Sequence, residues 1–381
     1  MHTHLFTPGP VEVSHEVRSA GAVPLVGHRS EAYYSLLGEV VSLLKGLMHA
    51  SQPVITLPSS GTGALEALAV NLLDPGDVVV SISCGAFGER FREIAARRGA
   101  DVIPVDIPRG RAATPDDVRR SLDENPCAAA ILLTHNETST GVLTDIRACT
   151  TALPEGGPLV LVDAVSSLGA VPCYPEEWRV DGLASCSQKG LMAPPGIGVI
   201  ALSERGWRRA DSRPSPSYYF DLPMHRRFLE KPRPQNPYTP PVSLLFSLAE
   251  ALRCLEKDGF ERRFAAVERT ACTFEAACEA MGMPLFVKDQ GMRSPAVTAI
   301  AVPGGRAGEM KRALAELGVD AAEGQGKEPV LRVAHYTPGG WPKLCLIAGS
   351  LYAAGRACGM ELAPDYIEAA WNCWRKGECA E

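Results

Sequence analysis

Ser185-Cys186-Ser187-Gln188-Lys189-Gly190 is the stretch that most restricts the fold and the chemistry of this chain. Its lysine is the one charged residue between Gly182 and Ile200, and small or apolar residues surround it. A lone lysine is usually a solvated surface charge. A desolvated lysine, however, loses its proton more easily and becomes a nucleophile. The stretch therefore makes Lys189 a candidate for covalent chemistry.

A second apolar run, Leu159–Val162, ends in the carboxylate Asp163. In a parallel α/β sheet, ligands bind beyond the carboxyl ends of the strands, so an acid at this point is well placed for function. The common alternative is an aspartate that caps a helix or a turn. The 26 residues from Asp163 to Lys189 (189 − 163) allow one crossover and a return to the same sheet edge.

Apolar runs alternate with helix-like segments on both sides of these two stretches. Continuous apolar strands indicate burial on both faces, and strand–helix alternation predicts a mostly parallel α/β sheet with helices on both sides. We expect strands at Val78–Ile82, Asp101–Val105, Ala129–Thr134, Leu159–Asp163, Gly182–Ser185 and Ile197–Leu202, and helices at Ser30–Met48, Ala64–Leu72, Gly88–Arg98, Thr114–Glu124 and Val242–Lys257.

The chain has 381 residues, which exceeds the size at which a single core usually keeps growing. We expect an N-terminal arm over residues 1–20, a large domain over 21–258 and a smaller α+β C-terminal domain over 259–381. Eight prolines between Pro214 and Pro241 predict a stiff extended loop and no helix there. That loop is either a surface excursion or an arm that reaches a partner subunit or covers a site.

Composition and charge exclude several classes of function. A net charge of -6 does not indicate a nucleic-acid partner. No apolar run approaches the roughly 20 residues that span a bilayer, and Met1-His2-Thr3-His4 lacks the features of a signal peptide, so we expect a cytoplasmic protein without a membrane partner. The 12 cysteines show no Cys-x-x-Cys spacing; we expect no metal site and cysteines packed in apolar surroundings, such as Cys84, Cys127 and Cys186.

Small residues and hydroxyls between Pro58 and Ala67 indicate a loop that enters a helix. Backbone N–H groups and the helix N-terminus would favour a phosphate there, and Ser60 and Thr62 add donors; a capped helix after a tight turn is the equal alternative. The loop lacks the lysine of a P-loop, and Glu66 stands where a dinucleotide fingerprint needs its third glycine. The phosphate is therefore expected to belong to a different cofactor.

The combination of these features points to pyridoxal 5'-phosphate (PLP). That cofactor needs an amine for its aldehyde, a carboxylate beside its pyridine nitrogen, a phosphate cradle and usually an aromatic ring over its face. Lys189, Asp163 and the loop Ser60–Gly63 supply the first three. Phe87 lies in a glycine-flanked loop after a predicted strand and is a candidate for the ring, with a core aromatic as the alternative.

With these residues in view, the sequence resembles the class V aminotransferases, fold-type I PLP enzymes of the alanine/serine–glyoxylate and 2-aminoethylphosphonate–pyruvate type. The likeness runs over about residues 5–260 and returns near Arg332. The stretches that carry it are Thr7-Pro8-Gly9-Pro10, Gly27-His28-Arg29-Ser30, Ser60-Gly61-Thr62-Gly63-Ala64-Leu65-Glu66, Thr134-His135-Asn136-Glu137-Thr138-Ser139-Thr140-Gly141, Val162-Asp163-Ala164-Val165-Ser166-Ser167-Leu168-Gly169 and Ser187-Gln188-Lys189-Gly190.

The resemblance implies a fold-type I architecture and a role for each matching residue. Lys189 would form the Schiff base with the cofactor and move the proton, and Asp163 would pair with the pyridinium nitrogen. Val165 would pack under the ring and Phe87 would stack on its other face. The remaining cofactor contacts would be Ser60, Gly61, Thr62, Gly63 and Gln188 at the phosphate and Thr138 at the ring hydroxyl or the substrate.

Three further matches concern the substrate and the partner subunit. Arg332 matches the arginine that clamps the substrate α-carboxylate, as a planar guanidinium can do bidentately. Gly9 would line the same pocket. Thr239 matches a residue that reaches the phosphate of the neighbouring subunit, which implies a homodimer with shared active sites.

The implied reaction is a ping-pong transfer of an amino group from an amino acid to a 2-oxo acid of the glyoxylate or pyruvate type. Three departures leave the donor and acceptor open. The stretch Ala334–Trp341 stands where the family has a glycine-rich stretch, and Asn236 stands where relatives often have tyrosine. The span Ser212–Pro234 is also distinctive, with its arginines and tyrosines. The alternatives are a lyase, an aldolase or a desulfurase on the same fold, or a non-catalytic dimeric relative. A nicotinamide oxidoreductase is disfavoured by the phosphate loop.

Overall fold

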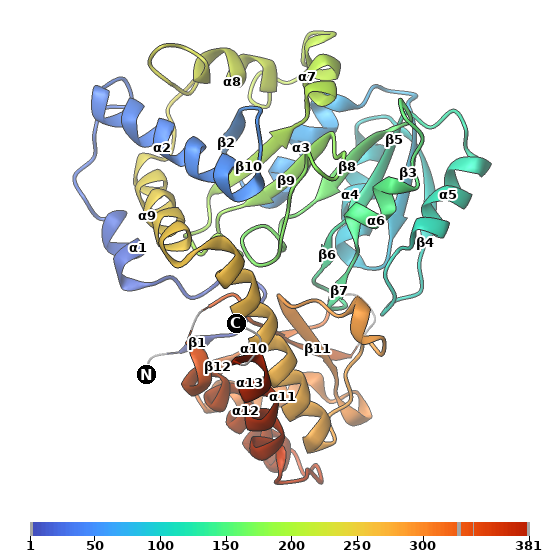
Figure 1. Ribbon diagram of the computed structural model, residues 1–381, viewed down its shortest axis with the longest axis vertical. Helices are drawn as coiled ribbons and strands as arrows, with labels where there is room; N and C mark the ends of the chain where they lie inside the picture. The colour runs from blue at the N-terminus through green and yellow to red at the C-terminus, as the bar shows by residue number, and fades with distance from the viewer. Residues whose placement is uncertain (1–2, 326–328, 338, 379–381) are drawn as a thin grey trace.

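The computed structural model describes residues 3–325, 329–337 and 339–378. Its central element is a seven-stranded sheet in the upper part of the molecule (Figure 1), with the strand order β2-β10-β9-β8-β5-β3-β4. The strands from β9 to β4 are parallel, whereas β10 runs antiparallel to both β9 and β2. In that order the strands are β2 (Val54–Pro58), β10 (Ile197–Leu202), β9 (Gly182–Cys186), β8 (Leu159–Asp163), β5 (Ala130–Thr134), β3 (Val78–Ser83) and β4 (Asp101–Asp106).

This sheet confirms the predicted α/β class and all six predicted strands; β2, at the sheet edge, was not predicted. The central strands are largely apolar because both of their faces are buried, whereas the edge strand β4 is partly exposed. In β8, Val160 and Val162 belong to the core on one side of the sheet, and Leu161 belongs to the core on the other side.

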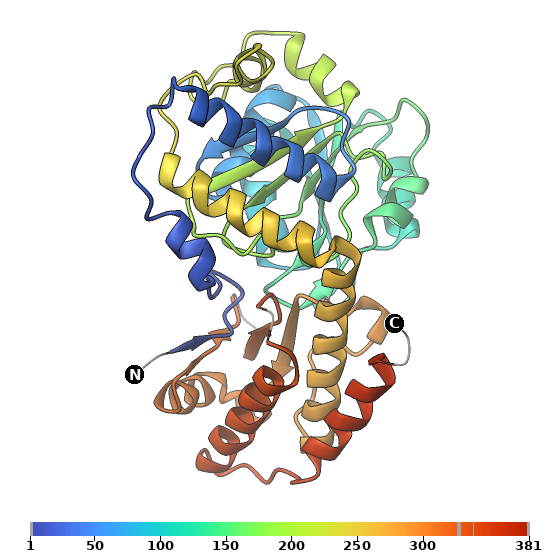
Figure 2. The same cartoon turned by 60° about the vertical axis from the view of Figure 1, so that its left-hand side comes forward.

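Helices cover both faces of the sheet. The first core includes residues of α2, α5, α6 and α9, and Figure 2 shows α2 and α9 side by side along one face. The second core includes residues of α3, α4, α7 and α8. Their bounds are α2 (Glu31–Met48), α5 (Pro115–Glu124), α6 (Ile146–Thr151), α9 (Val242–Asp258), α3 (Gly61–Leu72), α4 (Ala86–Arg97), α7 (Glu204–Asp211) and α8 (Leu222–Leu229). The five predicted helices are present within a few residues of their expected ends.

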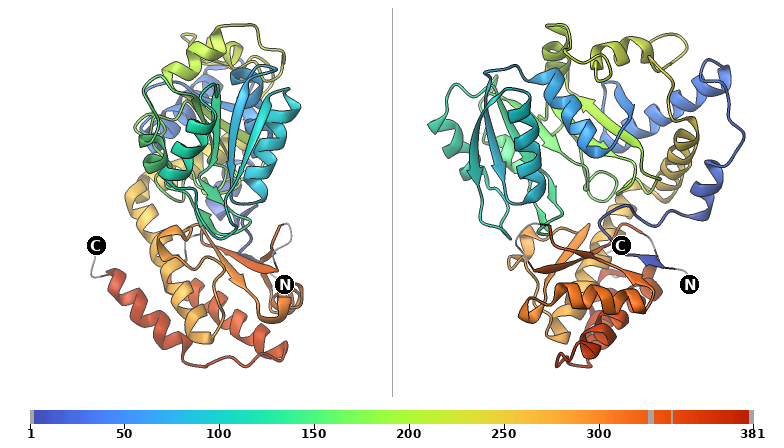
Figure 3. Two further views of the ribbon diagram at one scale, coloured as in Figure 1. Left: turned by 90° about the vertical axis from the view of Figure 1, so that its right-hand side faces the viewer. Right: turned by 180° about the vertical axis from the view of Figure 1, so that it is seen from behind.

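The C-terminal part lies below the large sheet and has its own core. It begins with α10 (Phe260–Met281), which Gly259 separates from α9, and Figure 3 shows α13 running beside α10. A three-stranded sheet has the order β11-β14-β13, and the N-terminal strand β1 pairs with β12 of this part. The remaining elements are β1 (His4–Leu5), α1 (His15–Ala20), β6 (Asn136–Glu137), β7 (Val142–Leu143), η1 (Gln290–Met292), β11 (Val297–Ala301), η2 (Pro303–Gly305), α11 (Ala307–Glu316), β12 (Val319–Asp320), β13 (Ala322–Glu323), β14 (Val330–Ala334), α12 (Gly340–Ala357) and α13 (Tyr366–Glu378).

Two sequence predictions are wrong. The proline-rich segment contains a helix, α8, because Asp221 caps its N-terminus and Pro223 stands in its first turn, where a missing N–H costs nothing. Cys127 is exposed instead of packed in an apolar environment, whereas Cys84 and Cys186 are buried as expected. Among the described residues, no helix has both the length and the apolar character that crossing a membrane requires.

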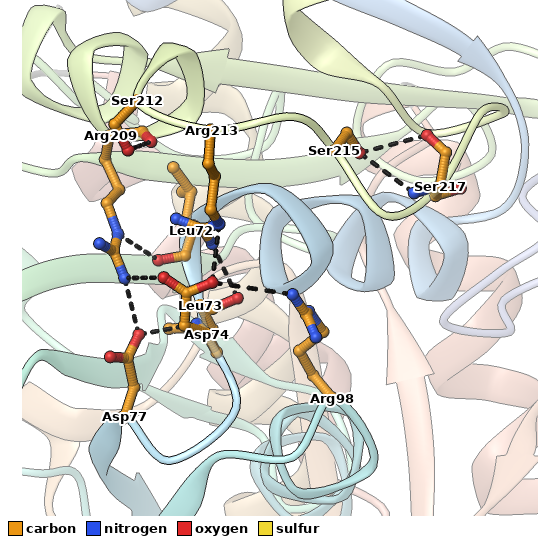
Figure 4. A network of polar contacts seen from close by, with 10 residues as sticks. All are labelled: Leu72, Leu73, Asp74, Asp77, Arg98, Arg209, Ser212, Arg213, Ser215 and Ser217. Atoms are coloured by element: carbon orange, nitrogen blue, oxygen red, sulfur yellow. Dashed lines mark hydrogen bonds and ion pairs between the residues drawn. The ribbon is translucent and has the colours of Figure 1, made fainter.

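A charge network fixes the start of the proline-rich segment to the end of α3 (Figure 4). Asp74 forms ion pairs with Arg98 at 3.9 Å, Arg209 at 3.0 Å and Arg213 at 2.7 Å, and Arg209 also pairs with Asp77 at 2.8 Å. Two of these arginines also donate to backbone carbonyls at the C-terminus of α3: Arg209 to Leu72 at 3.2 Å and Arg213 to Leu73 at 2.9 Å. The arginines thus satisfy helix carbonyls that have no partner within the helix.

Candidate active site

A cavity of about 290 Å³ brings together most of the predicted site residues. Its lining includes the residues that follow β8 and β9, which pair in parallel so that their carboxyl ends meet at one edge of the sheet. Ten predicted residues line it: Gly9, Ser60, Gly61, Thr62, Phe87, Thr138, Asp163, Val165, Gln188 and Lys189. Gly63, Arg332 and Thr239 do not belong to the described lining.

Lys189 extends from the loop after β9, where its amine donates a hydrogen bond to the carbonyl of Pro8. Burial lowers the pKa of Lys189 below its usual value; the nearby guanidinium groups of Arg332 and Arg90 add to this effect, and Cys186 and Asp163 oppose it. A lowered pKa increases the neutral fraction of the amine, which is the nucleophilic and basic form.

Gly9 gives the lysine its space. A Cβ atom on Gly9 would lie 2.6 Å from the Nζ atom of Lys189, and Gly9 has a φ of 123°, which side-chain-bearing residues rarely adopt. The N-terminal segment therefore approaches the amine at a position that only glycine fits.

Asp163 lies at the end of β8 and is only 3% exposed. Burial raises the pKa of Asp163 to about 7, although the N–H of Val165 donates a hydrogen bond to its carboxylate at 2.9 Å. A buried carboxylate of this kind favours a cationic or N–H partner inside the cavity.

The phosphate loop enters α3 as predicted, with the helix beginning at Gly61 and Ser60 as its N-cap. The hydroxyl of Ser60 accepts the N–H of Gly63 at 3.2 Å, so this N–H is used within the loop. A Cβ atom on Gly61 would lie 2.7 Å from a methyl group of Val165, so glycine lets the loop approach Val165 closely. Gln188 carries a buried amide oxygen that has no hydrogen-bond partner among the described residues. Gln188 lines the cavity together with Ser60, Gly61 and Thr62 at the start of α3.

Phe87 is fixed by a buried carboxylate whose role the sequence did not indicate. Glu137 accepts the N–H groups of Phe87 and Gly88, both at 3.0 Å, and the N–H and hydroxyl of Ser139 at 3.0 and 2.6 Å. Burial raises the pKa of Glu137, and these four hydrogen bonds oppose that shift. The ring of Phe87 also lies 4.9 Å below the guanidinium of Arg90.

Arg332 lies in β14 and is buried, as its position in an apolar strand predicted. Its guanidinium forms hydrogen bonds with backbone carbonyls. Its Nε and Nη2 atoms donate to Glu323 at 2.9 and 2.6 Å, and its Nη1 atom donates to Thr138 at 3.0 Å. Because Thr138 lines the cavity, Arg332 lies directly beside it. Thr239 is exposed on the proline-rich segment.

Sequence reasoning missed Arg90, Asn136 and Ser166, which also line the cavity. Asn136 donates its amide to the carbonyl of Ser166 at 3.1 Å, and the hydroxyl of the buried Tyr336 donates to the same carbonyl at 2.9 Å. Both Asn136 and Ser166 lie inside stretches that carried the resemblance. Arg90 follows Phe87 by three residues at the start of a predicted helix, and this spacing puts the two residues on one helix face.

The comparisons with known proteins agree with this arrangement. The family model for aminotransferase class-V matches residues 14–341. A soluble hydrogenase 42 kDa subunit from Anabaena cylindrica is 37% identical over 87% of each chain, and a serine–glyoxylate aminotransferase from Methylorubrum extorquens is 36% identical over 79% of this chain and 77% of its own. The structure of pyridoxamine–pyruvate aminotransferase from Mesorhizobium loti superposes with a TM-score of 0.92 at 28% identity, over 98% of this chain and 97% of its own.

The likeness to solved structures defines the fold as the fold-type I architecture of PLP-dependent transferases. The chain belongs to the class-V aminotransferase family, because the family model covers most of its length. It is therefore an aminotransferase, and PLP is the cofactor that this family implies. The cavity fits that group, because it combines an amine, a buried carboxylate, a helix N-terminus and an aromatic ring.

Proposed function

We propose that this enzyme holds PLP in the cavity and transfers an amino group from an amino acid to a 2-oxo acid of the glyoxylate or pyruvate type in two half-reactions. The observation that carries the proposal is that Lys189 and Asp163 line one cavity together with the N-terminal end of α3. The names of two relatives, a serine–glyoxylate and a pyridoxamine–pyruvate aminotransferase, support the choice of acceptor.

Each lining residue has a place in this proposal. PLP, when bound, supplies a ring that withdraws electrons from the carbon that bears the amino group. Lys189 would hold the aldehyde carbon, and Asp163 would hold the proton of the pyridine nitrogen. Phe87 and Val165 would contact opposite faces of the ring. Ser60, Gly61, Thr62 and Gln188 would bind the phosphate, with Gly63 supporting the loop through its hydrogen bond to Ser60.

The proton transfer is assigned to Lys189. Its lowered pKa favours the neutral amine, which can accept the α-proton of the substrate and return it to a neighbouring carbon. Gly9 and Pro8 hold the amine on one side of the cavity, so the same group serves both positions.

Arg332 is assigned to the substrate α-carboxylate. Three of its five N–H groups donate to the carbonyls of Glu323 and Thr138, which leaves one N–H on each terminal nitrogen. Two N–H groups on the terminal nitrogens of one guanidinium can bind a carboxylate bidentately. Thr138, which accepts from Arg332, would contact the ring hydroxyl or the substrate.

We also propose a homodimer in the cytoplasm, with Thr239 of each protomer completing the phosphate site of its partner. Thr239 is exposed and lies outside the lining of its own cavity, which supports a role across an interface. The test mixes the Lys189→Ala and Thr239→Ala variants. Sedimentation shows whether they form dimers, and an activity assay shows whether the two protomers share their sites. Hybrid dimers should carry one site with both substitutions and one with neither.

The assignment of Lys189 is tested by trapping. Borohydride reduction of PLP-loaded protein followed by peptide mass spectrometry should place the cofactor on Lys189 in the wild type and on no residue in Lys189→Arg, which keeps the charge. A cofactor trapped on another lysine, or a wild type that does not bind PLP, would contradict the proposal.

The reaction type is tested with a panel of amino acids and the acceptors glyoxylate and pyruvate. Transamination converts the donor to its 2-oxo acid and aminates the acceptor in equal amounts. Release of carbon–carbon cleavage products or of sulfide would instead identify a lyase, an aldolase or a desulfurase. A protein that binds PLP on Lys189 and turns over no member of the panel would favour the non-catalytic relative.

A further inference from the structure

We infer that Arg90 is an anion-binding residue of the cavity, and that it takes an oxyanion: the phosphate of the cofactor or a carboxylate of the substrate. The inference rests on the proposed function and extends it to a residue that the sequence motifs did not mark.

The position of Arg90 is the first observation. It is the fifth residue of α4 and lines the same cavity as Lys189 and Asp163. Its guanidinium lies 4.9 Å from the ring centroid of Phe87, the residue that covers the cofactor face in the proposed function. Contact with an aromatic face keeps a guanidinium oriented while its N–H edge stays available for another partner.

The second observation concerns the hydrogen-bonding and ion-pair partners of this guanidinium. Arg92 and Arg97, on the same helix, form ion pairs at 2.6 Å with Asp106 and Glu93. Among the described residues, Arg90 has no hydrogen bond or ion pair with a protein acceptor, and its side chain is exposed. It differs in this from Arg332, whose guanidinium binds backbone carbonyls and does not line the cavity.

The charge balance of the cavity is the third observation. Its described lining contains two basic side chains, Lys189 and Arg90, and one acidic side chain, Asp163; because the pKa of Lys189 is lowered, Arg90 is the constant cation among them. The buried carboxylate of Asp163 has the opposite preference, because it favours a cation or an N–H group as its partner. A planar guanidinium at the cavity wall therefore suits an incoming anion, which it can bind through two parallel N–H···O bonds.

Two sources can supply that anion. Thr62, at the phosphate loop, and Arg90 together line both the cavity and a neighbouring groove of about 420 Å³ between α3 and α4, which places Arg90 on the phosphate side. Arg90 also lines the same cavity as Lys189, whose amine is the reacting group in the proposed function. Phosphate and carboxylate present the same oxygen edge, and the experiment separates them.

The test compares Arg90→Gln and Arg90→Lys with the matched control Arg97→Gln, which removes an exposed arginine of the same helix outside the cavity. Thermal unfolding first verifies that each variant is folded. Dissociation constants are then measured for PLP, for pyridoxal without phosphate, and for succinate and acetate added to the PLP-loaded protein. Inorganic phosphate and succinate are also titrated into the cofactor-free protein.

Loss of a charged hydrogen-bond pair should weaken the relevant ligand about tenfold or more in Arg90→Gln and less in Arg90→Lys. If the anion is the phosphate, PLP and inorganic phosphate weaken while pyridoxal does not. If it is a substrate carboxylate, PLP is unchanged and the carboxylates weaken. The inference is overturned if Arg90→Gln binds all of these probes as Arg97→Gln does.

Equal binding by Arg90→Gln and Arg97→Gln is distinct from a failure of the proposed function. If the proposed function fails, the wild type itself does not take up PLP or does not attach it to Lys189. The titrations of inorganic phosphate and succinate into the cofactor-free protein would still decide whether Arg90 binds an oxyanion.

Discussion

Glu137 accepts hydrogen bonds from the backbone N–H groups of Phe87 and Gly88, both at 3.0 Å, although 50 residues separate Glu137 from Phe87 in the chain. The carboxylate is fully buried and also binds the N–H and the hydroxyl of Ser139. It therefore joins the hairpin after β5 to the start of α4. The position of the Phe87 ring at the cavity depends on this carboxylate, which does not line the cavity itself.

Replacing Glu137 by Gln should destabilise the protein and weaken PLP binding. The amide NH₂ group must face either the two N–H groups of α4 or the two donors of Ser139, so that buried donors lose an acceptor at about 1–3 kcal/mol. Urea unfolding and a PLP titration measure both effects. Thr140→Val is the control, since it removes only a hydrogen bond to the backbone carbonyl of Glu137 and leaves Phe87 bound. An unchanged PLP affinity in Glu137→Gln would show that the Phe87 loop does not need this carboxylate.

Replacing Gly9 by Ala should impair attachment of PLP more than it impairs folding. The new methyl group would lie 2.6 Å from the Nζ, Cε and Cδ atoms of Lys189, and the backbone would be strained at a φ of 123°. The lysine must then move, and we expect at least a tenfold loss of PLP affinity. Gly27→Ala is the matched control in the same N-terminal region, because nothing lies within 4 Å of its Cβ position. Equal affinities for the two variants would refute the role assigned to Gly9.

A third prediction concerns the charge network at the end of α3. Asp74→Asn leaves Arg98, Arg209 and Arg213 near one another without their shared carboxylate, and we expect a loss of about 1 kcal/mol in the free energy of unfolding. Glu93→Gln, which breaks an exposed pair with Arg97 in the body of α4, should have little effect. PLP affinity should be unchanged in both, because Ser60 caps the other end of α3 independently. Equal unfolding midpoints for the two variants would argue that the network is only a surface feature.

Much of this fold could be predicted because its central strands are buried on both faces. The central predicted strands are short apolar runs, because burial of both faces leaves little room for polar residues. The edge strand β2 was missed, although Val54-Ile55-Thr56-Leu57 has the β-branched character of a strand. The helix α8 was missed because proline was read as a helix breaker throughout, whereas a helix tolerates it in the first turn.

The candidate site was predictable where local sequence determines position. Asp163 and Lys189 each follow a buried strand, and parallel pairing of β8 and β9 puts them at one edge. The role of Glu137 was not predictable in this way, because its partners lie 50 residues away and no local pattern links them. Arg90 left a usable signal, its i+3 spacing from Phe87, but the exposure that makes it a binding residue appears only in the folded chain.

The final prediction concerns the pH dependence of the cofactor-free protein. Asp163 has an ordinary pKa of 3.8 in an unfolded chain, and burial raises it to about 7 in the folded protein. Between these two values the folded protein binds more protons than the unfolded chain. The free energy of unfolding therefore falls as the pH rises from about 4 to about 7, by at most about 1.4 kcal/mol per pH unit, and the loss is complete above that range.

Asp163→Asn removes this titration without changing the size of the side chain. Without cofactor, the free energy of unfolding of the variant minus that of the wild type should rise between pH 4 and pH 8. The rise should be of the order of a few kcal/mol and should leave the variant the more stable protein at pH 8. Urea unfolding at a series of pH values measures the difference, and groups that titrate in both proteins cancel from it. PLP should stabilise the wild type more than the variant at pH 8, because only the wild type has a buried carboxylate that pairs with the pyridinium proton. Parallel pH profiles for the two proteins would mean that Asp163 is not held as a buried, unpaired acid, and the pairing with the cofactor nitrogen would lose its physical basis.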